Sequence, residues 1–171
     1  ALSDVNPTQI AYNENNGQRI IGYQSGNVDI IEGNEVVNIS DIKKKSLNSS
    51  KSINSIFPKD DLAYLGCDFG IVVLDLKRYE IRETWLIGNN SAYVHINDID
   101  CDGDNIYVAT SSGVFKGNLN DHLVDFSKWS VITENSNYEW MSGKNYNTLK
   151  WFSDKLFVNY KSNLSRSDSI M

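Results

Sequence analysis

The sequence is poor in the residues that most often carry chemistry or cross a membrane. It has two cysteines and two histidines in 171 residues, and no apolar run reaches the roughly 18 residues that a membrane-spanning helix needs. Acidic side chains outnumber basic ones by 22 to 16, which gives a net charge of −6 with no basic stripe. We therefore expect no membrane span and no nucleic-acid partner, because a phosphate-binding surface needs concentrated positive charge.

Cysteine and histidine chemistry is limited in the same way. Cys67 and Cys101 are too few for a disulfide framework and lack the spacing of metal ligands. Each ends an apolar run, which favours buried free thiols, with a bridge between neighbouring repeats as the alternative. His95 and His122 lie far apart in the sequence, without a nearby cysteine or second histidine. A structural or surface role is expected for both histidines.

Motifs for catalysis or cofactor binding are also missing. The sequence has no Gly-rich phosphate cradle before a helix and no Gly-x-Ser-x-Gly elbow. Residues 98–103 match the first half of an EF-hand calcium loop, but Ala109 stands where that loop needs its final glutamate. Asp60 and Asp61 are typical of a hairpin turn rather than a catalytic acid pair. We predict no catalytic, cofactor-binding or metal-binding residue and no cofactor, and we expect that the chain is not an enzyme.

What the chain does contain is an internal repeat. Asn97 follows Asn54 by 43 residues, and a matching segment surrounds each of them. A fourth copy places Asn163 where glycine stands in the others, and Asn is the residue other than glycine that best tolerates positive φ. A β-type unit of roughly 40–45 residues is the size of a four-stranded propeller blade. The glycines that anchor the repeat lie 44 and 43 residues apart: Gly26, Gly70 and Gly113.

Short apolar runs, rich in β-branched and aromatic residues, recur in each copy and predict strands with almost no helix. Turn pairs such as Asn16-Gly17 and Asp102-Gly103 fall between these runs. A small residue recurs before the turn, at Gly22, Gly66 and Ala109, where neighbouring backbones can approach closely. The predicted strands are 8–12, 19–23, 28–31 and 36–39; 53–57, 62–67, 71–75 and 80–86; 96–101, 106–110, 114–116 and 129–132; and 148–152 and 155–160, with at most part of a third strand in the last copy.

The predicted fold class is all-β, a partial β-propeller with about three complete four-stranded blades plus part of a fourth. We expect one propeller fragment over residues 1–171, with blades at about 5–42, 52–88, 95–133 and 145–171, the last incomplete. Propellers close with four or more complete blades, so we expect an internal piece of a longer propeller, which would also explain why no initiator Met or signal peptide is present. Unpaired sheet edges should then drive self-association of the isolated piece.

Two segments are candidates for contacts with other molecules. The run Lys43-Lys44-Lys45 is the basic cluster of the chain and lies in a Ser- and Asn-rich connection, 40–52, which favours a solvated loop over a binding patch. Tyr138, Trp140 and Tyr146 lie in the long connection 133–147. Such a loop cluster either contacts a partner or glycan or covers the edge of a blade. We name these three aromatic residues as the possible partner-contact loop.

Three segments carry a resemblance to the PorZ family of the bacterial type IX secretion system. Residues 63–76, read as Ala63-Tyr64-Leu65-Gly66-Cys67-Asp68-Phe69-Gly70-Ile71-Val72-Val73-Leu74-Asp75-Leu76, resemble its blades. So do Gly22-Tyr23 with residues 27–31, and residues 125–127 with 129–133. The resemblance covers nearly the whole chain and falls in the first propeller of that family.

This resemblance implies a non-enzymatic scaffold or interaction module at the bacterial cell surface or in the periplasm. Members of the family have two propellers and a C-terminal β-sandwich, and they act in the complex that attaches secreted proteins to lipopolysaccharide. The implied partners are PorU, PorV and PorQ. Lipopolysaccharide binding belongs to the C-terminal domain, which this sequence lacks, so no ligand residue is carried over.

Two other classes of propeller compete with this interpretation. Residues 102–110 resemble the repeat of glycan-sensing propellers from hybrid two-component regulators, with Tyr107 where tryptophan is usual. The other copies match that repeat poorly, so a periplasmic glycan-sensing propeller is the alternative function. A catalytic propeller such as a sialidase would carry Ser-x-Asp-x-Gly-x-Thr-Trp boxes, which are absent.

Overall fold

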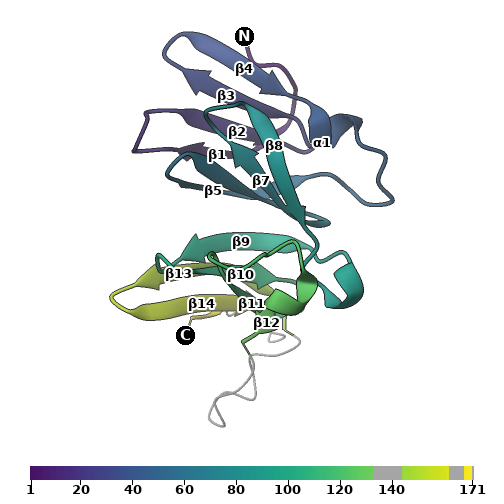
Figure 1. Ribbon diagram of the computed structural model, residues 1–171, viewed down its shortest axis with the longest axis vertical. Helices are drawn as coiled ribbons and strands as arrows, with labels where there is room; N and C mark the ends of the chain where they lie inside the picture. Colours follow the sequence, from purple (N-terminus) through teal and green to yellow (C-terminus); the bar gives the residue numbers. More distant parts are fainter. Residues whose placement is uncertain (133–143, 162–167, 171) are drawn as a thin grey trace. The chain divides into compact units, whose positions relative to one another are not determined.

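The computed structural model describes residues 1–132, 144–161 and 168–170 (Figure 1). The fold is all-β, a partial propeller, as the repeat predicted. Its strands form antiparallel sheets in which neighbours in the sequence are neighbours in the sheet. The chain divides into two compact units, Ala1–Trp85 and Leu86–Met171, each of which holds two sheets.

The first unit contains sheets A and B, each with four strands. Sheet A consists of β1 (Pro7–Tyr12), β2 (Arg19–Tyr23), β3 (Val28–Glu32) and β4 (Glu35–Ile39). A single helical turn, α1 (Asp41–Lys44), follows β4 within the segment predicted to be a plain loop. Sheet B consists of β5 (Ile53–Lys59), β6 (Leu62–Cys67), β7 (Gly70–Asp75) and β8 (Glu80–Trp85).

The second unit contains sheets C and D. Sheet C consists of β9 (Ile96–Cys101), β10 (Asn105–Thr110), β11 (Gly113–Asn118) and β12 (Ser130–Val131), with short 3-10 turns η1 (Asn89–Ser91) and η2 (Phe126–Lys128). The predicted strand 129–132 is shorter than expected because η2 runs up to Trp129, which caps it. Sheet D consists of β13 (Tyr146–Phe152), β14 (Lys155–Lys161) and β15 (Asp168–Ile170). Asn163 lies outside the described residues.

A β-bulge recurs near the start of the first strand in all four sheets. The extra residue is Thr8 in β1, Asn54 in β5, Asn97 in β9 and Asn147 in β13. Asn54 and Asn97 are the positions that the repeat had marked in the sequence. A bulge bends its strand and redirects the side chain of the extra residue. The repeated residues Asn54 and Asn97 therefore mark the bulges, where one residue of the first strand is left out of the pairing with the second strand.

Each unit has its own apolar core between its two sheets. In the first unit Ile20, Ile30, Ile53 and Leu65 are fully buried. Gly22 lies against sheet B, since a Cβ there would be 2.7 Å from Ile53 Cγ2. The sequence predicted that another backbone would approach here, whereas the nearest atoms at Gly22 belong to the side chains of Ile53 and Ile56. The core of the second unit is formed by Tyr107, Ala109, Val114, Tyr146, Leu149 and Val158.

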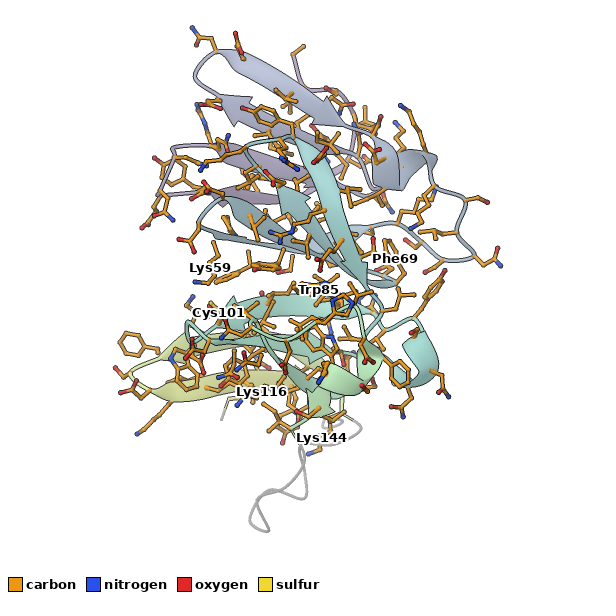
Figure 2. All side chains as sticks on the ribbon, in the orientation of Figure 1. Lys59, Phe69, Trp85, Cys101, Lys116 and Lys144 are labelled. Atoms are coloured by element: carbon orange, nitrogen blue, oxygen red, sulfur yellow. The ribbon has the colours of Figure 1, made fainter. Side chains whose placement is uncertain are left out.

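The two cysteines differ in their surroundings. Neither Cys67 nor Cys101 forms a disulfide bond. Cys67 is fully buried, as predicted, and burial raises the pKa of its thiol. Cys101, labelled in Figure 2, is half-buried at the end of β9 rather than fully buried. Within the described part of the chain, no helix is long and apolar enough to cross a membrane.

Candidate interaction surfaces

Two of the four bulge residues, Thr8 and Asn97, connect neighbouring sheets, one in each unit. Thr8 Oγ1 donates a hydrogen bond to the backbone oxygen of Ile53, at 2.6 Å. Asn97 Nδ2 donates to the backbone oxygen of Tyr146, also at 2.6 Å. Ile53 and Tyr146 are the first residues of β5 and β13. The same bond therefore recurs in both units: the bulge side chain of one first strand holds the start of the next.

Two aspartates of β9 add a second set of bonds between sheets C and D. Asp98 Oδ2 accepts the backbone N–H of Leu149 at 3.1 Å, and Asp100 Oδ2 accepts that of Trp151 at 2.8 Å. Lys150 Nζ lies 2.9 Å from Asp100 Oδ2. These two carboxylates, which resembled half of a calcium loop, are thus engaged by the sheet junction. Among the residues that the structure describes, no cluster of three or more His, Cys, Asp or Glu side chains could hold a metal ion.

The third aspartate of that motif closes the β9–β10 hairpin. Asp102 accepts hydrogen bonds from the backbone and side-chain N–H groups of Asn105 and from the Tyr107 hydroxyl, the last at 2.7 Å. Burial alone would raise the pKa of Asp102, but these bonds outweigh it and lower the pKa to about 2. The Tyr107 ring stacks on the Trp151 ring, with ring centroids 5.4 Å apart. The Nζ atom of Lys116, a residue labelled in Figure 2, lies 5.6 Å from the centroid of the Tyr107 ring.

In the first unit, buried amides of sheet A bind the hairpin ends of sheet B. Asn13 Nδ2 donates to the backbone oxygen of Asp60 at 2.8 Å, and Gln18 Nε2 donates to that of Leu76 at 3.2 Å. Asn13 and Gln18 are only 2% and 4% exposed. Asp60 has a φ of 53° between β5 and β6, so the pair Asp60-Asp61 forms a hairpin turn, as predicted. The turn contributes to the contact between sheets A and B through the backbone oxygen of Asp60, which accepts the Asn13 hydrogen bond.

The N-terminal segment covers part of the outer face of sheet A, the face turned away from sheet B. The Ser3 backbone N–H, the Tyr23 hydroxyl and the Asn38 amide donate to the buried Asp29 carboxylate at 2.8, 2.8 and 2.9 Å. Burial raises the pKa of Asp29, but these hydrogen bonds reverse the effect, so its pKa lies below the ordinary value. The buried charge is therefore stabilised by donors that include the N-terminal segment.

The rest of that outer face carries exposed apolar side chains together with the exposed Arg19, which pairs with Tyr12 in the sheet register. Ile10 and Tyr12 of β1 are 69% and 59% exposed, and Val36 of β4 is 37% exposed. Ile56 of β5 occupies the position in sheet B that Ile10 occupies in sheet A. Unlike Ile10, Ile56 packs on a neighbouring sheet, because its Cδ1 would lie 3.2 Å from a Cβ added at Gly22 of sheet A. We call Ile10, Tyr12 and Val36 the open face.

Of the three aromatic residues predicted to form a partner-contact loop, the structure describes Tyr146 alone. Tyr138 and Trp140 lie outside the described residues. Tyr146 is the first residue of β13 rather than part of the preceding connection, and it is fully buried. Its ring meets that of Tyr160 edge-on at 6.0 Å between centroids. The side chain of Tyr146 therefore packs in the core of the second unit, where a partner would not reach it.

The arrangement can be compared with known proteins. PorZ, described as an essential bacterial surface component of the type-IX secretion system of Porphyromonas gingivalis, is similar in structure with a TM-score of 0.75 and 24% identity. The match covers 99% of this chain and 22% of that one. The extracellular domain of BT4673, assigned to a hybrid two component system of B. thetaiotaomicron, has a TM-score of 0.66 and 19% identity, over 94% of this chain and 20% of that one.

A designed protein has the same fold at a similar length. The computationally designed Ika4 protein matches with a TM-score of 0.62 and 8% identity, over 100% of this chain and 94% of its own. At such identities, the similarity of all three structures concerns the fold. The chain spans about a fifth of the length of the two bacterial proteins. A search of curated proteins found no matching relative.

The family assignment comes from the sequence pattern of the blades. A family model described as the N-terminal β-propeller domain of PorZ from the type IX secretion system matches residues 1–130. That range contains sheets A and B and β9 to β11 of sheet C. The chain therefore belongs to the family of PorZ N-terminal β-propeller domains.

Proposed function

We propose that this chain is a non-catalytic interaction module of a type IX secretion complex at the bacterial cell surface or in the periplasm. The family match over residues 1–130 is the observation that carries the proposal. The described carboxylates of residues 98–102 support it, because they bind backbone and side-chain donors of the fold itself. The proposed partners are the PorU, PorV and PorQ proteins of the same organism.

The test measures binding of the purified chain to purified PorU, PorV and PorQ by biolayer interferometry. Saturable binding to at least one of them is expected. The double variant Tyr138→Ala/Trp140→Ala tests the aromatic loop as the contact, with Tyr93→Ala as control because Tyr93 is an exposed aromatic residue in another segment, 46% exposed. Loss of binding in the double variant alone would support the loop. Absence of binding to all three proteins would contradict the proposed partners.

The second candidate function is a periplasmic glycan-sensing propeller of a hybrid two-component regulator. It is supported by the structural similarity to the BT4673 extracellular domain. The complete reading frame separates the two functions. A transmembrane helix followed by a kinase domain would favour sensing, whereas a second propeller and a C-terminal β-sandwich would favour secretion.

We further propose that the isolated chain associates with itself through the open face. Ile10 and Tyr12 lie on one strand and are each more than half exposed, and neighbouring exposed apolar side chains can mark an interaction surface. In sheet B the position equivalent to Ile10 is filled by a side chain that packs on the neighbouring sheet. The open face is thus shaped for another sheet, which a second copy supplies in the absence of other chains.

A further inference from the structure

A groove lies between the α1 turn and sheet B in the first unit. Its volume is about 430 Å³. Phe69, labelled in Figure 2, lies in the β6–β7 turn and forms the groove floor together with Val72 of β7 and Ile81 of β8. Lys44 and Lys45 line it from the α1 side. We call this hollow the α1 groove.

The α1 turn is held in place by three contacts, so the groove exists before any ligand arrives. Ile42 is 2% exposed and packs on the turn at Gly26, where an added Cβ would lie 2.8 Å from Ile42 Cγ2. Lys43 Nζ forms an ion pair with Asp4 at 2.7 Å. Lys51 Nζ donates to the backbone oxygen of Lys43, also at 2.7 Å. A site that is already formed loses less conformational entropy on binding.

The lysines of the groove remain available for a ligand. Lys43 is paired with Asp4, but neither Lys44 nor Lys45 forms an ion pair with another residue in the described part of the chain. Asp41 is the single carboxylate among the lining residues, against two ammonium groups. The groove is therefore positive on a chain whose net charge is −6. Such a local field attracts an anion that the rest of the surface repels.

The shape of the groove limits what the anion can be attached to. Phe69 and Val72 are only 2% and 1% exposed, so the floor offers little apolar area: the partly exposed Ile81 can contact one apolar side chain, and a long acyl chain would find no room. A membrane or nucleic acid would extend well beyond the groove over a chain whose net charge is −6, and that charge would repel it. A short peptide avoids both problems, because an extended chain places side chains alternately on its two sides.

We propose that the α1 groove binds an acidic peptide segment of a protein partner, with carboxylates at Lys44 and Lys45 and an apolar side chain against Ile81. The proposal rests on the contacts and charges of the first unit and does not depend on the type IX assignment. Binding of the peptide and binding of PorU, PorV or PorQ are separate measurements. A chain that fails to bind the peptide can still bind PorU, PorV or PorQ, and the reverse holds as well, so each result tests its own proposal.

The test uses the whole chain and fluorescence anisotropy with a fluorescein-labelled peptide that has a Phe-Leu pair flanked on each side by two glutamates. Saturable binding that weakens as salt is added is expected, because exposed charges are screened. Lys44→Glu/Lys45→Glu should weaken binding by roughly tenfold or more, which corresponds to about 1.4 kcal/mol. Lys128→Glu/Lys155→Glu is the matched control, since it makes the same change in net charge at exposed lysines outside the groove.

Peptide variants separate the two halves of the site without altering the protein. Replacing Phe-Leu by Ala-Ala tests the apolar floor, and replacing glutamate by glutamine tests the lysines; each change should weaken binding severalfold. Three results would overturn the proposal: no saturable binding by the unmodified chain, equal loss in both charge-reversal variants, or groove-dependent binding of laurate or anionic lipid vesicles without binding of the peptide.

Discussion

Gly22 on β2 packs directly against Ile53 on β5. A methyl group at Gly22 would lie 2.7 Å from Ile53 Cγ2 and 3.0 Å from its Cβ, closer than side-chain atoms normally approach. Ile53 is fully buried, so it has little room to move away. The small residue at this repeat position is therefore a requirement of how sheets A and B pack.

The first prediction concerns this contact. Gly22→Ala should lower the free energy of unfolding by about 1–3 kcal/mol, because an extra methyl overfills a packed site. Urea unfolding of the purified chain, followed by tryptophan fluorescence and circular dichroism, measures the loss. Ile53→Ala removes Cγ2 and serves as the second arm of a double-mutant cycle. The two losses should be less than additive, and strict additivity would show that the residues do not clash.

The second prediction concerns the junction between sheets C and D. Asp100 is 4% exposed and accepts the Trp151 N–H at 2.8 Å. Asp100→Ala should lower the free energy of unfolding by about 1–3 kcal/mol, because it leaves a backbone donor without its acceptor. Asp100→Asn retains an oxygen acceptor and should cost less. Amide hydrogen exchange at Trp151, measured by NMR, should quicken more in the alanine variant. Equal exchange in both variants would contradict a role for this bond.

The third prediction is a pH dependence from the β9–β10 hairpin. The pKa of Asp102 is about 2 in the folded chain, against about 3.9 for an unfolded aspartate. Protons therefore bind the unfolded chain more readily, so the stabilisation by Asp102 is complete above about pH 4 and is lost as the pH falls toward 2. Solvent screening limits it to on the order of 1 kcal/mol.

Asp102→Asn tests this pH dependence. The variant should be less stable than the unmodified chain at neutral pH, and the difference should shrink as the pH falls through the range below about 4. Urea unfolding at several pH values measures both. Asp104→Asn is the control, because it removes an equal charge from the same turn. A difference that stays constant with pH would mean that the Asp102 carboxylate is not stabilised by its hydrogen bonds.

The fourth prediction concerns the open face. If Ile10 and Tyr12 mediate self-association, Ile10→Ser/Tyr12→Ser should shift the isolated chain to monomer at concentrations where the unmodified chain is associated. Sedimentation equilibrium or light scattering measures the mass. Val5→Ser/Val124→Ser changes two exposed apolar residues outside the sheets, 74% and 40% exposed, and should leave the mass unchanged. A strictly monomeric unmodified chain at high concentration would contradict the proposal.

Much of the fold is predictable because it is encoded locally. Strand ends were predicted within a few residues, since apolar runs and turn pairs such as Asp102-Gly103 act on neighbours in the chain. Other features depend on distant partners. Local signals did not reveal that Ile42 would anchor a helical turn on Gly26, or that Tyr146 would be drawn from a loop into a core. Both outcomes follow from packing against segments remote in the sequence.

The amino-acid order alone determined the repeat, the strands and the family, because a period of 43 or 44 residues and the turn glycines are properties of the chain itself. Only the tertiary structure decided what each repeated polar residue does. Asn97 and Asp100 bind the start and the backbone of β13, and Lys44 and Lys45 line the α1 groove. Hydrogen bonds and ion pairs act over a few ångströms, so their partners are fixed only when the sheets have met.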